Sequence, residues 1–232
     1  MPAVRRVEGT EEYKEDFKMD NRINNNRASV VGEVAAEFEF SHELYGEKFY
    51  TTELLAERTS GVQDRIVVMV SDKLIDVKEV WKGLILSVSG RFQSHNRHMP
   101  DGRNKMELFV FVTSVEVLSG TERLPEEEKN NLYLDGYICK TPVYRVTPLG
   151  REIADVLLAV NRAYGRTDYI PCVCWGRNAK FASRLNVGAH CVINGRIQSK
   201  TYWKVLEDGR VEDRVAREIS VRSIELQMEE EQ

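Results

Sequence analysis

The chain has 232 residues, of which 42% are hydrophobic and 30% charged, and its formal net charge is −4. This is the composition of a soluble globular protein, and no stretch approaches the about 20 apolar residues that a membrane helix needs. The length allows one large domain or two of about 100 residues each. The N-terminus lacks the apolar core of a secretory signal and is too acidic for a transit peptide, so we expect a cytoplasmic protein with no membrane contact.

Charge is distributed unevenly along the chain. Residues 26–118 carry 11 Lys and Arg against 14 Asp and Glu, whereas residues 130–226 carry 15 against 10. The remaining segments are acidic on balance. The negative total therefore hides a basic second half and does not exclude a nucleic acid as partner.

Residues 1–25 form a charged N-terminal segment. Tyr13 and Phe17, four residues apart, could form a stripe on one face of a short helix. The alternative is a flexible segment, and this is the interpretation that we favour.

The rest of the chain consists of two copies of one pattern. Gly32 recurs 104 residues later as Gly136, and the motif Gly-Arg-Phe-Gln-Ser at 90–94 recurs 105 residues later as Gly-Arg-Ile-Gln-Ser at 195–199. This self-similarity predicts two structural repeats. We assign them to residues 26–118 and 130–226, joined by a polar linker at 119–129 and followed by an acidic tail at 227–232.

Each copy has the element order of one small barrel. In the second copy, apolar patterns predict strands at 131–139, 152–161 and 169–175, and 177–185 can form a short helix. Two further strands, 189–200 and 216–226, flank the hairpin signal Asp208-Gly209, which Asp101-Gly102 matches in the first copy. We therefore predict an all-β protein of two tandem five-stranded OB-fold barrels, each with a short helix between strands three and four.

A glycine lies in the middle of the fourth predicted strand of both copies, at Gly90 and Gly195. Interior glycines weaken strands, so this position predicts a bend where a small barrel turns a corner. Simple inheritance within the repeat is the alternative.

No residue pattern predicts catalysis. Cys172 and Cys174 lie on one face of a predicted strand, which favours buried apolar side chains over a metal or redox site, although the latter stays open. The four histidines show no metal-ligand spacing, and phosphate-binding and dinucleotide-binding loops are absent. We expect no enzyme activity, no catalytic residue, no metal and no cofactor.

The second copy interleaves aromatic side chains with Arg and Lys. Exposed bases offer flat faces on which aromatic rings stack, and phosphates need cations, so this combination suits single-stranded nucleic acid. Packing alone also enriches strands in aromatic residues, which leaves a structural interpretation open. Because Tyr202 and Trp203 are adjacent in a strand, only one of them is expected to face a given groove. The candidate residues for binding single-stranded DNA are Tyr164, Tyr169, Trp175, Tyr202, Trp203, Arg162, Arg177, Arg196, Lys200 and Lys204.

The second copy resembles the bacterial single-stranded DNA-binding protein family. The resemblance covers nearly all of residues 130–226 and rests on NLYLDGYI at 131–138, VTPLG at 146–150, LLAVNR at 157–162, YIPCVCWG at 169–176 and GRIQS at 195–199. It implies stacking of bases on Tyr164, Tyr169, Trp175 and Tyr202. The first copy departs from the family at three of these places, where it has Arg65, Ser71 and Arg97, so we expect it to bind DNA weakly or to serve as a structural or protein-binding partner.

The resemblance also implies partners. Family members usually assemble four OB-folds, so a chain with two implies a homodimer, and many recruit replication or repair proteins through an acidic tail with an apolar tip. Residues 227–232 carry the acid without that tip.

Three functions are compared on this basis. The first is sequence-tolerant binding of single-stranded DNA in replication, recombination or repair, chiefly by the second OB-fold. The alternative is an OB-fold interaction module of a replication or mobile-element complex with little direct DNA contact, and the third is an enzyme that uses Cys172 and Cys174.

Overall fold

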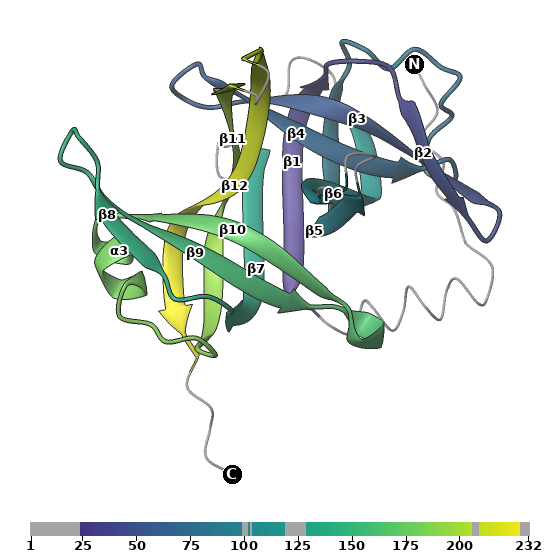
Figure 1. Ribbon diagram of the computed structural model, residues 1–232. Helices are drawn as coiled ribbons and strands as arrows, with labels where there is room; N and C mark the ends of the chain where they lie inside the picture. Colours follow the sequence, from purple (N-terminus) through teal and green to yellow (C-terminus); the bar gives the residue numbers. More distant parts are fainter. Residues whose placement is uncertain (1–23, 99–101, 103, 119–128, 206–208, 228–232) are drawn as a thin grey trace.

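The computed structural model describes residues 24–98, 102, 104–118, 129–205 and 209–227, most of which lie in strands (Figure 1). The predicted segments 1–25, 119–129 and 227–232 lie outside the described residues, apart from a residue or two at their edges. No helix in the described ranges is long and apolar enough to cross a membrane.

The strands form two barrels of the same order. The first barrel consists of β1(Asn26–Val34), β2(Glu39–Leu44), β3(Glu47–Glu57), β4(Gln63–Ser71), β5(Ile85–His98) and β6(Asn104–Leu118). The second barrel consists of β7(Asn130–Ile138), β8(Val143–Val146), β9(Glu152–Asn161), the 3-10 turn η1(Ala163–Gly165), β10(Thr167–Trp175), α3(Arg177–Ala182), β11(His190–Val205) and β12(Val211–Leu226).

Each barrel is closed by the strand pairing of an OB-fold. In the second barrel β7 pairs with both β9 and β11, β9 pairs with β10, and β11 pairs with β12. A parallel contact between β10 and β12, at Cys172 and Ile219, completes the ring. The first barrel has the same closure, with β4 parallel to β6 at Val68 and Val110. The predicted fold, two tandem OB-folds, is confirmed.

Each barrel also has a short strand that the sequence did not predict. β2 pairs with β3, and β8 pairs with β9. Every residue of both short strands is exposed. Because the prediction relied on alternation between apolar and polar residues, a strand with no buried face gives no such signal.

The barrel interiors are filled by alternate residues of the strands. Cys172 and Cys174 are among the buried side chains, which confirms their interpretation as buried apolar residues, and Cys191 is buried as well. The fully buried residues include Val30, Leu54, Val68, Phe92 and Val110 in the first barrel and Leu134, Leu158, Ile170, Ile193 and Ile219 in the second.

Gly90 and Gly195 lie at matching irregularities of the two barrels. The pairing register shifts between Ser89 and Gly90 in β5 and between Asn194 and Gly195 in β11. A Cβ atom on Gly195 would lie 2.5 Å from the carbonyl oxygen of Ser220. The predicted bend is therefore confirmed as a β-bulge whose close strand approach requires glycine.

The helix predicted between strands three and four is present in only one barrel. In the second barrel, α3 occupies this place. In the first, residues 72–84 form a series of turns, so the prediction of a helix there is wrong. The connection is anchored by Trp81, which is buried and donates a hydrogen bond from Nε1 to the carbonyl oxygen of Asp76 at 2.8 Å. The turns, in place of a regular helix, bring the carbonyl oxygen of Asp76 within hydrogen-bonding distance of this buried indole.

The two barrels join through their first strands. β1 and β7 pair antiparallel, with Ala28 opposite Leu132, Asn26 opposite Leu134 and Val30 opposite Asn130. Because the repeat offset is 104 here, Ala28 and Leu132 are equivalent positions. Asn26 pairs with the equivalent of Val30, and Val30 pairs with the equivalent of Asn26. The barrels are thus related by a local two-fold axis between Ala28 and Leu132, and a single sheet order runs through both.

Candidate nucleic-acid interface

Tyr169 and Trp175 lie at the two ends of β10, on its outward face. The intervening strand alternates with buried side chains, among them Ile170 and Cys172. This alternation directs both rings away from the core, where 45% of Tyr169 and 39% of Trp175 are exposed. Neither ring is sealed in hydrophobic packing, so each leaves part of its surface open to a planar group.

Tyr164 lies in the connection between β9 and β10. Its backbone is left-handed, with φ 59° and ψ 33°, a conformation that costs an L-residue roughly 1–2 kcal/mol. The side chain is 67% exposed. Tyr45, in the turn between β2 and β3 of the first barrel, has a similar φ of 49° and is 93% exposed. The two turns thus each present an exposed tyrosine with a positive φ.

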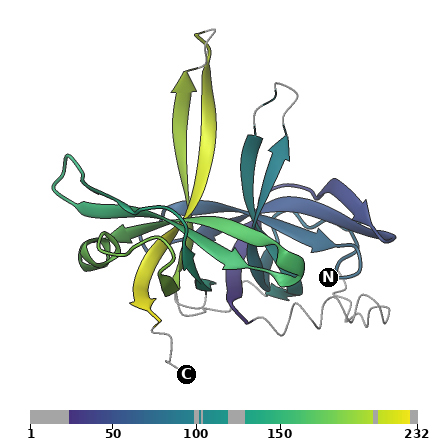
Figure 2. The ribbon, with the colours of Figure 1, turned by 60° about the horizontal axis from the view of Figure 1, so that its bottom comes forward.

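Tyr202 and Trp203 lie on the hairpin formed by β11 and β12, which projects from the body of the molecule beside the β5–β6 hairpin (Figure 2). Both are exposed, because this part of the hairpin lies outside the barrel and has no buried face. Lys200 and Lys204 alternate with Tyr202 and share its face of β11. That face therefore offers an aromatic ring between two cations, while Trp203 lies on the opposite face.

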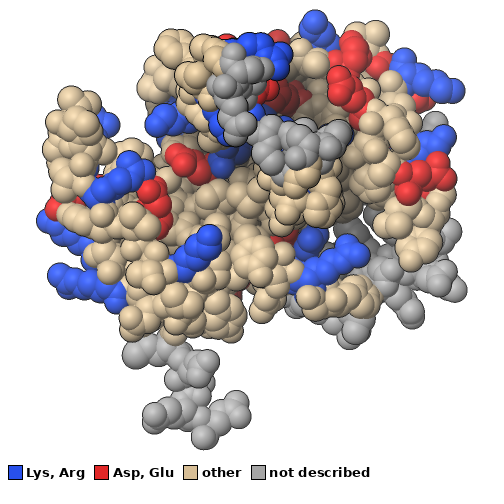
Figure 3. All heavy atoms as spheres, in the orientation of Figure 1, with Lys and Arg blue, Asp and Glu red and all other residues tan. Residues whose placement is uncertain are grey.

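Arg177 begins α3 directly after Trp175 and Gly176, and its side chain is exposed. Lys180 in the same helix is 3.1 Å from a carboxylate oxygen of Glu152. Figure 3 shows Lys and Arg predominating over the side of the second barrel that holds α3 and β8, whereas acidic clusters lie among the basic side chains of the first barrel.

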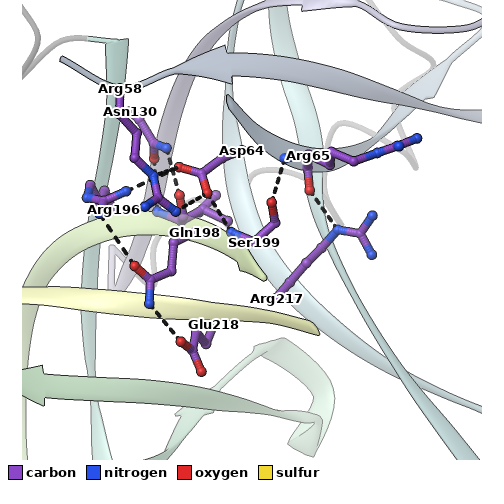
Figure 4. Close-up of polar contacts among 10 residues, drawn as sticks. Arg58, Asp64, Arg65, Asn130, Arg196, Gln198, Ser199, Arg217 and Glu218 are labelled. Atoms are coloured by element: carbon purple, nitrogen blue, oxygen red, sulfur yellow. Dashed lines mark hydrogen bonds and ion pairs between the residues drawn. The ribbon is translucent and has the colours of Figure 1, made fainter. Parts of the chain in front are cut away.

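Arg162 and Arg196, which the sequence proposed as phosphate contacts, are held at the junction between the barrels. Arg162 Nε lies 3.2 Å from the buried Asp168 carboxylate. Arg196 Nη1 lies 3.1 Å from the buried Asp64 carboxylate, as Figure 4 shows. Both carboxylates are fully buried. Because a buried carboxylate needs a cationic partner, these arginines contribute to the junction between the barrels, a role that their selection as phosphate contacts did not anticipate.

The repeated motif explains why these carboxylates are buried. The Ser94 N–H donates to Asp168 Oδ1 at 2.7 Å, and the Ser199 N–H donates to Asp64 Oδ1 at 2.6 Å. Each bond runs from the motif of one barrel to β4 or β10 of the other. Burial raises the pKa of the Asp168 carboxyl, and its contacts with Ser94 and Arg162 oppose that shift. Sequence reasoning missed this role, although the repetition of Gly-Arg-x-Gln-Ser was the signal for it.

The first barrel lacks rings at the places equivalent to Tyr169 and Trp175. Arg65 is paired with Glu53 at 2.5 Å, and Ser71 is buried and hydrogen-bonded to Glu47. The third departure, Arg97 on β5, lies 3.8 Å from Glu107. The stacking surface expected from the sequence is thus confined to the second barrel.

Nothing in the described part of the chain gathers three or more His, Cys, Asp or Glu side chains in a way that could hold a metal ion. Burial raises the pKa of the Cys174 thiol to about 12 and that of Cys191 to about 11. Thiols of this kind are protonated near neutral pH and are poor nucleophiles.

Comparison with known proteins relates the second barrel to one family. Residues 129–227 match the Single-strand binding protein family. Over 80 residues, 32% of this chain, the sequence is 36% identical to Single-stranded DNA-binding protein 2 of Listeria innocua and to Single-stranded DNA-binding protein A of Bacillus subtilis, covering 50% and 46% of those proteins. The chain spans about half the length of the curated relatives it matches.

The whole two-barrel arrangement is also similar to a solved structure. The wild-type single-stranded DNA binding protein from Thermus aquaticus superposes with a TM-score of 0.65 and 20% sequence identity, over 89% of this chain and 95% of that one. At this identity the likeness shows the fold alone, and it extends over both barrels.

Proposed function

Because residues 129–227 match the Single-strand binding protein family, we propose that the chain binds single-stranded DNA, with the second barrel as its principal contact surface. The observation that carries the proposal is the exposure of Tyr164, Tyr169, Trp175 and Tyr202 on connected elements of one barrel. Base stacking on such rings contributes about 1–3 kcal/mol for each base and does not depend on sequence.

The cations beside these rings support phosphate contacts. Lys200 and Lys204 flank Tyr202 on its own face of β11, and Arg177 follows Trp175. Arg162 and Arg196 are left out of the contact set, because each is paired with a buried carboxylate. Phosphate contacts release condensed counterions, so the affinity falls as salt rises.

Single-strand preference follows from the same geometry. In a duplex the base faces are stacked on each other and cannot meet a protein ring, whereas in a single strand they are open. We place the protein in replication, recombination or repair, where such strands occur, acting by binding and not by catalysis. A homodimer with four OB-folds, and contacts with replication or repair proteins, complete the proposal.

A second candidate function is an interaction module that touches DNA little. The acidic balance of the first barrel and the replacement of its rings by Arg65 and Ser71 favour it for that half of the chain. Under this alternative, the protein co-purifies with a protein partner but does not retard oligo-dT at low salt.

The test of DNA binding is the double variant Trp175→Ala and Tyr202→Ala. We expect it to weaken binding to oligo-dT by roughly 2–6 kcal/mol in total, because two stacking surfaces are removed. Tyr45→Ala, which removes an even more exposed ring from the first barrel, is the control. Unchanged affinity in a double variant that still folds, judged by thermal unfolding, would refute the proposal.

A further inference from the structure

The β11–β12 hairpin has two exposed faces of different chemistry. Tyr202 shares its face with Lys200 and Lys204, whereas Trp203 lies on the other face. On the second face Val205 pairs with Val211, and Trp203 pairs with Asp213. Trp203 is 76% exposed and Val205 69%. One hairpin therefore presents an aromatic ring on each side.

The face that carries Trp203 also contacts the first barrel. Ser199 lies four residues before Trp203 and shares its face, and the Ser199 Oγ accepts a hydrogen bond from the Arg65 N–H at 2.8 Å (Figure 4). Arg217, opposite Ser199 on β12, donates from Nε to the Arg65 carbonyl oxygen at 2.8 Å. The hairpin is thus fixed to β4 of the first barrel, at the position equivalent to Tyr169.

Positive charge accompanies this junction. Arg65 and Arg217 both pair with the single carboxylate of Glu53. Two guanidinium groups that share one carboxylate leave a net positive charge, and 53% of the Arg65 side chain is exposed. At about 3.3 Å for each strand residue, Trp203 stands about 13 Å along the hairpin from this cluster.

Resting on the DNA-binding function proposed above, we propose that Trp203 and Arg65 form a second binding segment that carries the same strand of DNA across the first barrel. Trp203 supplies the stacking ring that β4 lacks, and Arg65 contacts a phosphate of that segment. The second barrel therefore provides aromatic contacts on both sides of its hairpin. Tyr202 lies on the DNA path over the second barrel, and Trp203 lies on the path over the first barrel.

Tryptophan fluorescence separates the two segments, because the three tryptophans differ in exposure. Trp81 is buried and out of reach of DNA, whereas Trp175 and Trp203 are exposed. In Trp175→Phe the DNA-accessible reporter is Trp203, and in Trp203→Phe it is Trp175. The probes are oligo-dT of about 10 nucleotides, within the range of one OB-fold, and of about 30, which exceeds it.

With one oligonucleotide per chain, we expect Trp203→Phe to be quenched by both lengths and Trp175→Phe by the long one alone. Equal quenching of Trp175→Phe by the short oligonucleotide would place Trp203 on the second barrel's own path and overturn the inference. Quenching by neither length would remove Trp203 from any DNA path. If Trp203→Phe is quenched by neither length, the DNA-binding function itself fails.

The affinity for the long oligonucleotide tests Arg65. Arg65→Ala retains the backbone bonds to Ser199 and Arg217, and we expect about a fivefold loss at 0.1 M salt, the effect of one phosphate contact. Lys82→Ala is the matched control, since Lys82 lies in the connection 72–84, whose Gly83 is bonded to β1 of its own barrel. Equal affinities of the two variants would exclude Arg65 from the segment.

Discussion

At Tyr169 and Trp175 the second barrel exposes two aromatic rings, whereas the first barrel has Arg65 and Ser71 at the equivalent positions. The junction between the barrels shows the opposite behaviour. Asp64 and Asp168 are both buried, and each accepts a hydrogen bond from the equivalent serine of the other barrel. Residues that join the two copies are therefore alike in both, whereas residues on the outer surfaces differ.

The side chains around the two buried carboxylates also show where the symmetry is incomplete. Asp64 is bonded to both Arg58 and Arg196, one from each barrel. Asp168 is paired with Arg162 and lies in an environment that raises its pKa. The junction is therefore equivalent in its main-chain bonds and less so in its charges.

The largest effect is expected from breaking this junction. Asp64→Ala leaves two arginines around an empty site, and removal of one partner from a buried pair destabilises by about 3–5 kcal/mol. The measurement is the free energy of unfolding by urea. Asp155→Ala, which removes the exposed partner of Arg145, is the control and should cost at most about 1 kcal/mol. Similar losses in the two variants would contradict a structural role for the buried carboxylate.

A smaller effect is expected at Tyr164, and Tyr45, the other tyrosine with a positive φ, provides the comparison. Tyr164→Ala should weaken binding to oligo-dT by about 1–3 kcal/mol, because it removes a stacking ring from the second barrel. Tyr45→Ala removes the same side chain from a turn with a positive φ in the first barrel and should leave the affinity unchanged. The affinities are measured by titration at one fixed salt concentration. A loss of equal size in both variants would show that the rings are not specialised by barrel.

The smallest effect on function is expected from the thiols. With pKa values of about 12 and 11, Cys174 and Cys191 are almost fully protonated at pH 8 and should resist alkylation in the folded chain. Mass spectrometry after iodoacetamide treatment should find them modified only after unfolding, with DNA binding retained by the treated native protein. Rapid labelling of either thiol in the folded state would contradict their burial.

The strands could be predicted because they carry local signals. The alternation of apolar residues predicted β10, the Asp-Gly pair predicted the β11–β12 hairpin, and Gly195 predicted the bend at its bulge. β2 and β8 escaped prediction because their residues are all exposed. The helix expected in the first barrel was wrong because a buried Trp81, and not the local pattern, decides the path of residues 72–84.

The candidate site could be predicted only in part, since a sequence does not reveal which cations find a distant partner. Lys200 and Arg196 look alike in the chain, but Arg196 meets Asp64, 132 positions away. The exposed rings were identified through motifs shared with a family, whereas the two faces of the hairpin became distinguishable only when Ser199 was located against Arg65.

The pairing of β1 with β7 has a genetic consequence. When two identical polypeptides meet at such an edge, every substitution appears twice, once on each side of the axis. Here both sides are encoded in one reading frame, so an amino-acid change alters one side and spares the other. Two fused barrels can therefore take on different functions while the β1–β7 pairing between them is kept.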